Sequence, residues 1–378
     1  MQLKWVKHFF AWNIGKEKSE ELMKDFLEEV QKCLKENDYS KFTDTLEKYK
    51  YPAGSVLPFQ VLGKALEYNR IGWASHILDS YSIDSINDKE EPVITAAARY
   101  GNRAIFEKLL AHGADLHALN HVKTSAIWRA LSFKNYKGVR ALIELGFDLK
   151  SNGGNALRTA SWDGKFEMVR LFVEHGADVN FNGPDQVFPY CTTPVQMAAN
   201  GNHFEIVTYL VEHGADVTMK DKYGNRAFLE AKRHKNTEMM EYIKQFEPSI
   251  WHEADQRAAE LKKMGLPSDI MKWLGTENRR IDLPETCPAQ YIEFETIFDV
   301  KPIEWQGRVF WDLTKEVEGY GSTGFVIWIP DQKCLGSFDV EHEELYTYGG
   351  LKWNQFIKKL PIVVDIVLDG LPIDELME

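Results

Sequence analysis

The sequence predicts an α solenoid, a stack of helical hairpins, followed by a smaller α+β domain with an antiparallel sheet. The first observation is a repeated phrase, because VRLFVEHGADVN at 169–180 returns as VTYLVEHGADVT at 207–218. The second is a change after residue 248 from helical spacing to short apolar stretches of strand length. The third is charge: residues 1–248 carry 32 basic and 33 acidic side chains, whereas residues 249–378 carry 13 and 24. A chain of 378 residues has room for both parts.

Composition and charge exclude several classes of protein. The longest apolar stretch, GFVIWIP at 324–330, is far shorter than the roughly 20 residues of a membrane helix, so we expect no membrane association. A C-terminal third with a net charge of −11 (13 basic against 24 acidic side chains) repels phosphate backbones, which argues against nucleic acid and favours a basic protein partner. The cysteines lie too far apart for a zinc motif or a disulfide framework, so we expect a reducing cytoplasm. They are Cys33, Cys191, Cys287 and Cys334.

The N-terminal residues predict a helix. MQLKWVKHFFAWNIG has aromatic residues between lysines, but it has no unbroken apolar core and no small-residue cleavage site, so a secretory signal is not expected. We therefore expect an N-terminal capping helix over 1–19 and a repeat array over 20–248. A linking helix over 249–264 and an acidic α+β domain over 265–378 follow.

Four windows of the array share one pattern and define its repeat. LLAHGADLH, LIELGFDLK, FVEHGADVN and LVEHGADVT align on Gly113, Gly146, Gly176 and Gly214, and each ends a helical stretch. A glycine at this position takes the left-handed conformation that a helix C-cap requires. Small-residue runs about twelve residues earlier (TAAARY, WRALSF, RTASWD, QMAANG) mark a first helix that approaches the second closely. One such hairpin cannot bury its apolar face alone, whereas a stack can.

These repeats resemble ankyrin repeats. Thr193, Pro194 and Ala198 match the T-P-L-H-x-A motif of that family, with Gln196 in place of the usual histidine. GADVN at 176–180 matches its G-A-D-V-N positions without change. The resemblance covers four repeats closely and loosens toward both ends, as terminal repeats with a polar outer face do. It implies about seven hairpins over 20–248, with a lengthened finger loop at 184–191.

Ankyrin stacks bind other proteins on a concave surface, so the resemblance implies protein binding without catalysis. In that family the two residues after the alanine pair and the tips of the finger loops face the groove. Tyr, Trp and Arg are enriched at interface hot spots, so we interpret these positions as binding anchors. The alternative is that the rings only pack within the core. The positions carried over by register include Tyr68, Arg99, Tyr100, Phe133, Trp162 and Asp163.

Residues 265–378 predict the α+β domain. YIEFETIF, RVFWDLT, GFVIWIP, CLGSFDV and LYTYG, from residue 291 onward, are of strand length and are separated by turn residues. WNQFIKKL at 353–360 restores helical spacing. The Leu-Pro helix GLPSDIMKWL at 265–274, the strands and the closing helix with Phe356 resemble the SUKH superfamily. Many bacterial members of that superfamily are immunity proteins against secreted toxins, including nucleases. The sequence departs from the superfamily at 275–280, where GTENRR stands in place of the usual Asn-Gly-Gly.

Two short motifs of this domain are candidates for a ligand-binding or catalytic site. GYGSTG at 319–324 matches G-x-G-x-x-G, but it leads into a strand instead of opening a helix, so no dinucleotide site is expected. DVEHEEL at 339–345 is acidic, yet neighbours along a strand point to opposite faces, which argues against a metal or acid-base site. We interpret it as a solvated acidic turn that meets a basic partner through Glu341, Glu343 and Glu344. No catalytic residue, metal or cofactor is expected.

The sequence thus favours a cytoplasmic, non-enzymatic protein that binds another protein, with a bacterial immunity protein and its basic toxin as the specific hypothesis. Two alternatives remain open. In one, the protein is an ankyrin scaffold or adaptor whose C-terminal domain caps the solenoid. In the other, residues 265–378 house an enzyme, which a ligand or metal among Asp339, Glu341 and His342 would favour.

Overall fold

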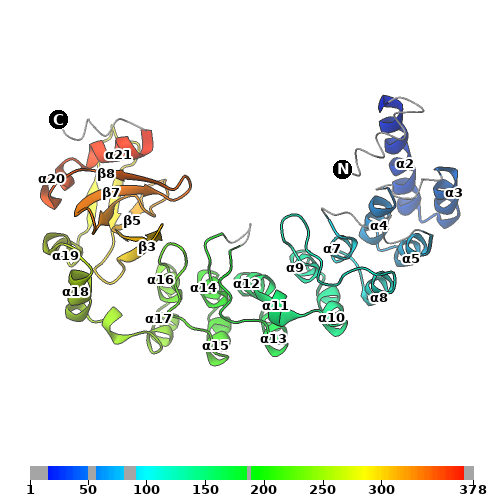
Figure 1. Ribbon diagram of the computed structural model, residues 1–378, viewed down its shortest axis with the longest axis horizontal. Helices are drawn as coiled ribbons and strands as arrows, with labels where there is room; N and C mark the ends of the chain where they lie inside the picture. The colour runs from blue at the N-terminus through cyan, green and yellow to red at the C-terminus, as the bar shows by residue number, and fades with distance from the viewer. Residues whose placement is uncertain (1–15, 50–56, 81–90, 185–188, 370–378) are drawn as a thin grey trace. The chain divides into compact units, whose positions relative to one another are not determined.

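The computed structural model describes residues 16–49, 57–80, 91–184 and 189–369 (Figure 1). These residues form two compact units. The first unit holds residues 16–160 and 165–181, and the second holds residues 161–164, 182–184 and 189–369. No helix within these ranges is long and apolar enough to cross a membrane.

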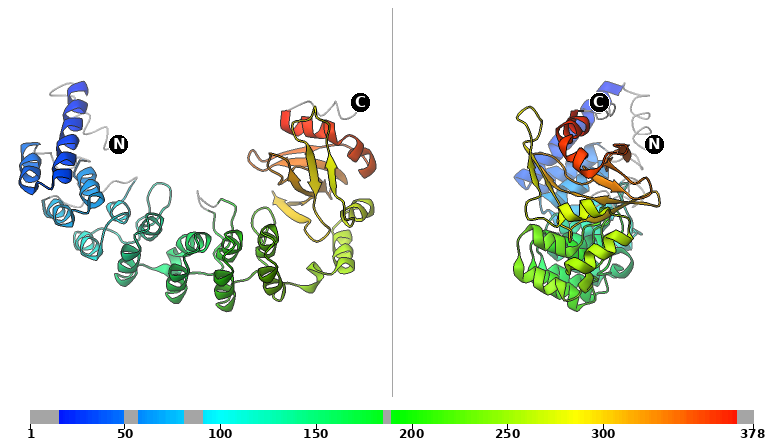
Figure 2. Two further views of the ribbon diagram at one scale, coloured as in Figure 1. Left: turned by 180° about the vertical axis from the view of Figure 1, so that it is seen from behind. Right: turned by 90° about the vertical axis from the view of Figure 1, so that its left-hand side faces the viewer.

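The first unit is built of helices in sequential pairs, and consecutive pairs lie side by side (Figures 1 and 2). The helices are α2 (Lys16–Glu36), α3 (Tyr39–Tyr49), α4 (Leu57–Glu67), α5 (Ile71–Ser80), α7 (Val93–Ala97), α8 (Arg103–Ala111), α9 (Ala126–Ser132), α10 (Tyr136–Glu144), α11 (Leu149–Asn152), α12 (Gly154–Trp162) and α13 (Phe166–Glu174).

The predicted boundary at residue 19 is wrong, because α2 continues through it without a break. Phe26, Val30 and Leu34 are buried at spacings of four residues, so one apolar face runs along the helix. Residues 1–15 of the predicted capping helix lie outside the described residues.

The repeated glycines stand where the sequence predicted. Helices α8, α10, α13 and α15 (Phe204–Glu212) each end two residues before one of them. The φ angles of Gly113, Gly146, Gly176 and Gly214 are 88°, 95°, 85° and 93°. The amide after each glycine donates to the carbonyl five residues earlier at 2.9–3.0 Å, which closes the helix end as a Schellman motif. The predicted register of the repeat is confirmed.

The second unit has its own helical pairs, formed by α14 (Pro194–Asn200) with α15 and by α16 (Ala227–Arg233) with α17 (Thr237–Lys244). Helix α14 begins with a capping box, in which the side chains of Thr193 and Gln196 bond each other's backbone amides. The buried Gln196 side chain also donates to the carbonyls of Met219 (3.2 Å) and Asn225 (2.6 Å). The residue that replaces the usual histidine therefore ties one helix start to the next loop.

After α17 the chain forms a short 3-10 turn, η1 (Ser249–Trp251), and two helices, α18 (Ala254–Lys263) and α19 (Ser268–Leu274). Eight strands follow in two antiparallel sheets. The three-stranded sheet has the order β1 (Arg280–Asp282), β2 (Tyr291–Phe294), β5 (Thr314–Val317). The five-stranded sheet has the order β3 (Lys301–Trp305), β4 (Arg308–Asp312), β6 (Ile327–Ile329), β7 (Cys334–Asp339), β8 (Glu344–Thr347). Helices α20 (Trp353–Lys358) and α21 (Leu360–Asp369) close the described chain.

The strands are antiparallel as predicted, but the prediction of a single sheet is wrong. RVFWDLT was expected to be one strand, whereas the chain leaves the larger sheet after Asp312 and enters the smaller one at Thr314. Between them Leu313 is fully buried, and the hydroxyl of Thr314 accepts a hydrogen bond from the amide of Val326 at 2.9 Å. These contacts fix the crossing between the sheets.

The predicted linking helix is part of the C-terminal domain. Helix α18 buries Leu261 in the same apolar cluster as Ile270 of α19, Phe294 of β2 and Phe356 of α20. The guanidinium of Arg257 also donates to the carbonyl of Val300 at 2.6 Å. The domain therefore begins at about residue 254 rather than at 265, because the apolar face of α18 needs this core to be buried.

The C-terminal domain packs on the last helical pair of the same unit. Lys232 of α16 pairs with Asp299, and Lys301 of β3 donates to the side-chain oxygen of Asn225 at 2.9 Å. Gly224, with a φ of 74°, lies so close that an added Cβ would meet the carbonyl of Pro302 at 2.3 Å. The loop before α16 is therefore an integral part of this contact.

Candidate protein-binding surface

Arg99, Tyr100 and Phe133 form a small exposed surface at the ends of the first helices of two neighbouring pairs; we call it the Tyr100 surface. Tyr100 follows α7 and Phe133 follows α9, and they are 42% and 41% exposed. Their rings meet edge to face, with centroids 5.8 Å apart and an interplanar angle of 74°. The Arg99 guanidinium lies 5.1 Å from the centre of the Phe133 ring. Two aromatic rings and a cation are thus held together while remaining open to solvent.

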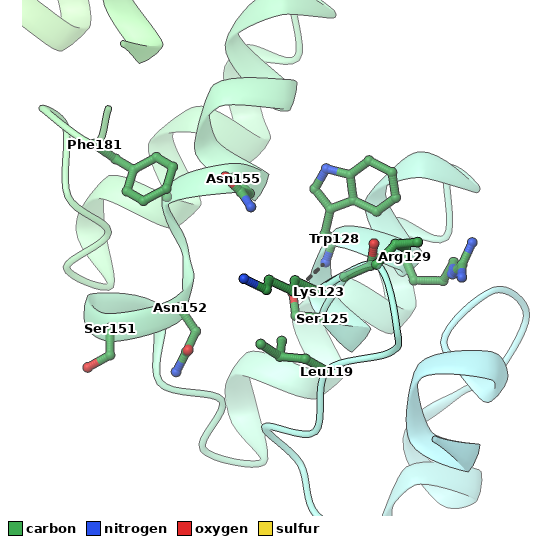
Figure 3. A pocket seen from close by; sticks show the side chains of 12 residues that line it. Leu119, Lys123, Ser125, Trp128, Arg129, Ser151, Asn152, Asn155 and Phe181 are labelled. Atoms are coloured by element: carbon green, nitrogen blue, oxygen red, sulfur yellow. Dashed lines mark hydrogen bonds between the residues drawn. The ribbon is translucent and has the colours of Figure 1, made fainter. Parts of the chain in front are cut away.

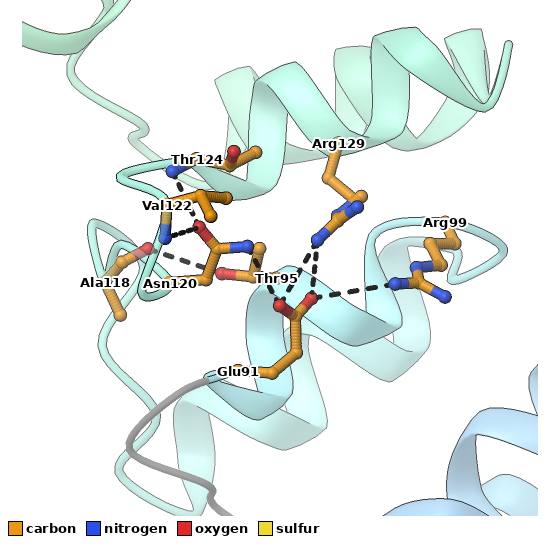
Figure 4. Close-up of polar contacts among 8 residues, drawn as sticks. All are labelled: Glu91, Thr95, Arg99, Ala118, Asn120, Val122, Thr124 and Arg129. Carbon is orange, nitrogen blue, oxygen red and sulfur yellow. Dashed lines mark hydrogen bonds and ion pairs between the residues drawn. The ribbon is translucent and has the colours of Figure 1, made fainter. Parts of the chain in front are cut away.

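A carboxylate holds the arginine in place (Figure 4). Glu91 pairs with the Arg129 guanidinium at 2.9 Å and with Arg99 at 3.9 Å. The Glu91 side chain is only 18% exposed, so these charges interact more strongly than they would at an open surface. Glu91 thereby restricts the conformations of the Arg99 side chain, whose guanidinium lies against the Phe133 ring. Neither Glu91 nor Arg129 was predicted from the sequence as a candidate residue.

The same carboxylate reaches the next finger loop through Asn120. The Asn120 amide donates to Glu91 at 2.9 Å, and its oxygen accepts from the amides of Val122 (3.2 Å) and Thr124 (2.8 Å). Asn120 is 4% exposed, and Figure 4 shows it between the loop and Glu91. The loop and the two arginines are therefore linked through Glu91 by hydrogen bonds and ion pairs.

The other aromatic positions have different surroundings. Trp162 is 41% exposed and Asp163 is exposed, and the carbonyl of Trp162 pairs with the ring nitrogen of His203 at 3.0 Å. Tyr68 is half-buried, and its hydroxyl accepts from the side chain of Gln31 on α2 at 3.3 Å. Tyr68 is therefore less open than the other rings, because α2 packs near it.

The comparisons with known families decide the nature of the array. A family described as ankyrin repeats (three copies) matches residues 94–183, and one described as ankyrin repeats (many copies) matches residues 156–211 and 195–243. Residues 94–243 are ankyrin repeats. Ankyrin repeats are a protein-binding module, and Arg99, Tyr100 and Phe133 lie within them. No curated protein matches the chain.

Two parts of the predicted ankyrin array lie outside the matched ranges. Helices α2 to α5 precede residue 94 and form two further pairs. The lengthened ankyrin finger at 184–191 includes residues 185–188, which are not among the described residues. Beyond them Tyr190 packs against Tyr223 of the following finger, with ring centroids 5.2 Å apart and an interplanar angle of 47°.

Part of the predicted acidic surface of the C-terminal domain is engaged in ion pairs and hydrogen bonds within the chain. Asp339 accepts hydrogen bonds from the amides of Glu341 (2.9 Å) and His342 (3.0 Å), so DVEHEEL is a turn between β7 and β8. Its bond to the His342 ring raises the pKa of that histidine. Glu343 pairs with Lys222 of the last ankyrin finger at 3.3 Å, and Glu344 accepts from the hydroxyl of Tyr346. The three glutamates are therefore exposed, but two of them already have partners.

A group of buried charges lies where the C-terminal domain meets the array. Asp299 is 5% and Asp312 0% exposed, and Lys301 lies 3.9 Å from Asp312. Burial raises the pKa of Glu295 to about 8 and that of Asp312 to about 6, although Lys301 opposes both shifts. No pattern in the sequence predicted this group of charges.

The two motifs of the C-terminal domain lie in connections between strands. GYGSTG at 319–324 joins β5 to β6, so a strand follows it where a dinucleotide loop has a helix. In the described ranges no three His, Cys, Asp or Glu side chains are grouped so that they could hold a metal ion.

Proposed function

We propose that the protein is a non-enzymatic binding protein of the cytoplasm whose Tyr100 surface contacts a protein partner. The observation that supports this most is the combination of exposure and restraint at Tyr100 and Phe133. Aromatic and arginine side chains supply most interface hot spots. Since the edge-to-face contact and Glu91 already restrict these groups, binding loses little side-chain entropy. Trp162 and Asp163, which belong to the second unit, occupy the equivalent position of their own repeat and are proposed as a further contact for a protein partner.

The test begins with the partner itself. The full chain is used to capture proteins from its native cell, and the captured protein is identified and its Kd measured. We expect Tyr100→Ala and Phe133→Ala each to weaken binding by about 2 kcal/mol, the size of a hot-spot contact. Phe246→Ala is the matched control, because Phe246 is 49% exposed but lies after α17. An unchanged Kd in both variants would rule out the Tyr100 surface.

A second candidate function concerns the acidic C-terminal third. Its net charge of −11, from 13 basic and 24 acidic residues, favours a basic partner, and the resemblance to SUKH immunity proteins suggests a bacterial toxin such as a nuclease. Glu341 is the proposed contact of the acidic turn, since Glu343 and Glu344 have partners within the chain. The scaffold alternative is supported instead by the contacts of Asp299 and Lys301 with the array.

A further inference from the structure

One repeat of the array has a shortened segment before its first helix. Twelve residues (114–125) separate Gly113 from α9, and twelve (215–226) separate Gly214 from α16. Only seven residues (147–153) separate Gly146 from α12. The one-turn helix α11 occupies this segment, and its first turn is capped by Asp148, whose carboxylate accepts from the amide of Ser151 at 3.2 Å. The finger loop at 119–124 is therefore followed by a repeat that has no full-length finger.

A cavity of about 280 Å³ occupies that space (Figure 3). Such a volume is slightly below the range of about 300–1,000 Å³ that is usual for small-molecule sites, and it suits a protein side chain. Its walls come from the 119–125 loop, α9, α11 and the start of α12, all within the first unit. Side chains that define it include Leu119, Lys123, Trp128, Asn155 and Phe181.

The apolar walls of this cavity are fixed in position. The indole nitrogen of Trp128 donates to the hydroxyl of Thr159 at 3.0 Å. The Phe181 ring lies directly against Gly154, where an added Cβ would meet its Cγ at 2.2 Å. The guanidinium of the buried Arg158 lies 5.0 Å from the ring centre. Leu119, on the opposite loop, is 45% exposed although it is apolar.

The polar side chains around the cavity can all donate hydrogen bonds. Among the described residues that line it there is no carboxylate. The Asn155 oxygen accepts from Arg158 at 2.8 Å, which leaves its amide hydrogens to point toward the opening. Arg129 also lines the cavity, but its charge is paired with Glu91. Lys123 therefore carries the positive charge available to a ligand, and Figure 3 shows its ammonium directed across the cavity.

We propose that this cavity binds an acidic peptide segment of a partner protein. An aliphatic or aromatic side chain of the segment enters between Leu119, Trp128 and Phe181, and a neighbouring Asp or Glu pairs with Lys123. The Asn155 amide donates to a backbone carbonyl of the segment. This inference rests on the proposed function, since it names the chemistry of the bound partner, but it uses residues outside the Tyr100 surface.

The test uses the full chain and a displayed library of random peptides at low salt. We expect the parent to enrich peptides in which an apolar residue stands beside Asp or Glu. Leu119→Glu, which replaces an apolar wall by a negative charge, and Lys123→Glu, which reverses a positive charge, should each weaken the binding of these peptides about tenfold or more. Lys137→Glu is the matched control, because Lys137 is exposed on α10 and does not line the cavity. Thermal melts check that every variant folds like the parent.

The outcomes separate this proposal from the previous one. Peptides lost in Leu119→Glu and Lys123→Glu but kept in Tyr100→Ala support the cavity as a site of its own. Peptides lost in Tyr100→Ala but kept in both cavity variants overturn the cavity and leave the Tyr100 surface intact. A parent that enriches no acidic motif, or a Lys137→Glu variant that loses the peptides equally, also overturns it.

Discussion

The ammonium of Lys232 on α16 lies against the carboxylate of Asp299 in the C-terminal domain, so the last ankyrin repeat and that domain share an ion pair. Asp299 is 7% exposed at its side chain, and the hydroxyl of Thr296 donates to the same oxygen. The ion pair therefore lies at the boundary between the last repeat and the C-terminal domain, and it is only partly open to water.

We expect Asp299→Asn to lower the free energy of unfolding by about 1–3 kcal/mol, because the buried side of the pair loses its charge while Lys232 stays. Urea denaturation of the full chain measures this. Glu167→Gln is the control, since Glu167 pairs with Arg170 at 2.8 Å on an exposed helix face, where such pairs contribute at most about 1 kcal/mol. Equal losses of unfolding free energy in the two variants would show that the burial of Asp299 does not strengthen its ion pair.

The titration of Glu295 should lower the stability of the fold as the pH rises. Glu295 titrates near 4.5 when unfolded and at about 8 when folded, because burial disfavours its charged form. Its contribution is therefore complete below pH 4.5 and is lost as the pH rises through 8, and Asp312 acts in the same direction between 3.8 and about 6.

Glu295→Gln should remove much of this dependence, since the amide does not titrate. Urea denaturation at about pH 5 and about pH 8.5 compares parent and variant. Glu293→Gln is the control, because Glu293 lies two residues before Glu295 and its side chain pairs with Lys315. This variant should change the free energy of unfolding equally at the two pH values. Parallel pH curves for the parent and Glu295→Gln contradict the assignment.

Gly176→Val should destabilise the array by about 1–2 kcal/mol, because a branched side chain is strained at positive φ. Space does not decide this, since an added Cβ at Gly176 meets only Lys150, at 4.0 Å. Gly63 in α4 also has open space around it, and Gly63→Ala should instead stabilise by about 0.5–1 kcal/mol. Thermal and urea unfolding of both variants test the contrast, and a neutral Gly176→Val would remove the conformational explanation.

Gln196→Ala should cost about 2 kcal/mol or more, because it leaves the buried carbonyls of Met219 and Asn225 without this donor. Gln196→His, which restores the residue usual in ankyrin repeats, should lose less, since a ring nitrogen can still donate. The free energies of unfolding of the two variants decide it. A histidine variant less stable than the alanine variant would mean that the glutamine acts through its shape alone.

If the second candidate function is right, association with the captured partner should slow steeply as ionic strength rises past about 0.1 M, where the Debye length is about 10 Å. Glu341→Gln should lower the on-rate further. Glu238→Gln makes the same charge change on the exposed face of α17 and should have a smaller effect. A flat salt response would exclude a basic toxin as the electrostatic partner.

The array was more predictable than the C-terminal domain because its signals are local. Gly113 and Gly214 end helices through the conformation of one residue, and a repeated phrase makes such positions visible. Leu313, by contrast, looks like any strand residue, and only its packing between two sheets shows that the chain changes sheet there.

The candidate site could be predicted only in part for a similar reason. Register from the ankyrin resemblance indicated Tyr100 and Phe133, and the structure finds both exposed. Glu91 was missed because its partner Arg129 lies 38 residues away and no local pattern connects them. The shortened segment at 147–153 was visible as an uneven spacing of the repeated glycines. Its consequence, a cavity, depends on Trp128 and Phe181 lining the same space.

The close approach of Gly224 to Pro302 has a practical consequence for engineering this protein. The contacts of the array with the C-terminal domain come from Lys222, Gly224, Asn225 and Lys232, all in the last repeat. A consensus repeat could therefore be grafted upstream of this segment without disturbing the junction, whereas one added after α17 would have to reproduce the glycine and both lysines. In this architecture, the number of repeats can therefore change before the last repeat, whereas the last repeat itself must keep the residues that contact the C-terminal domain.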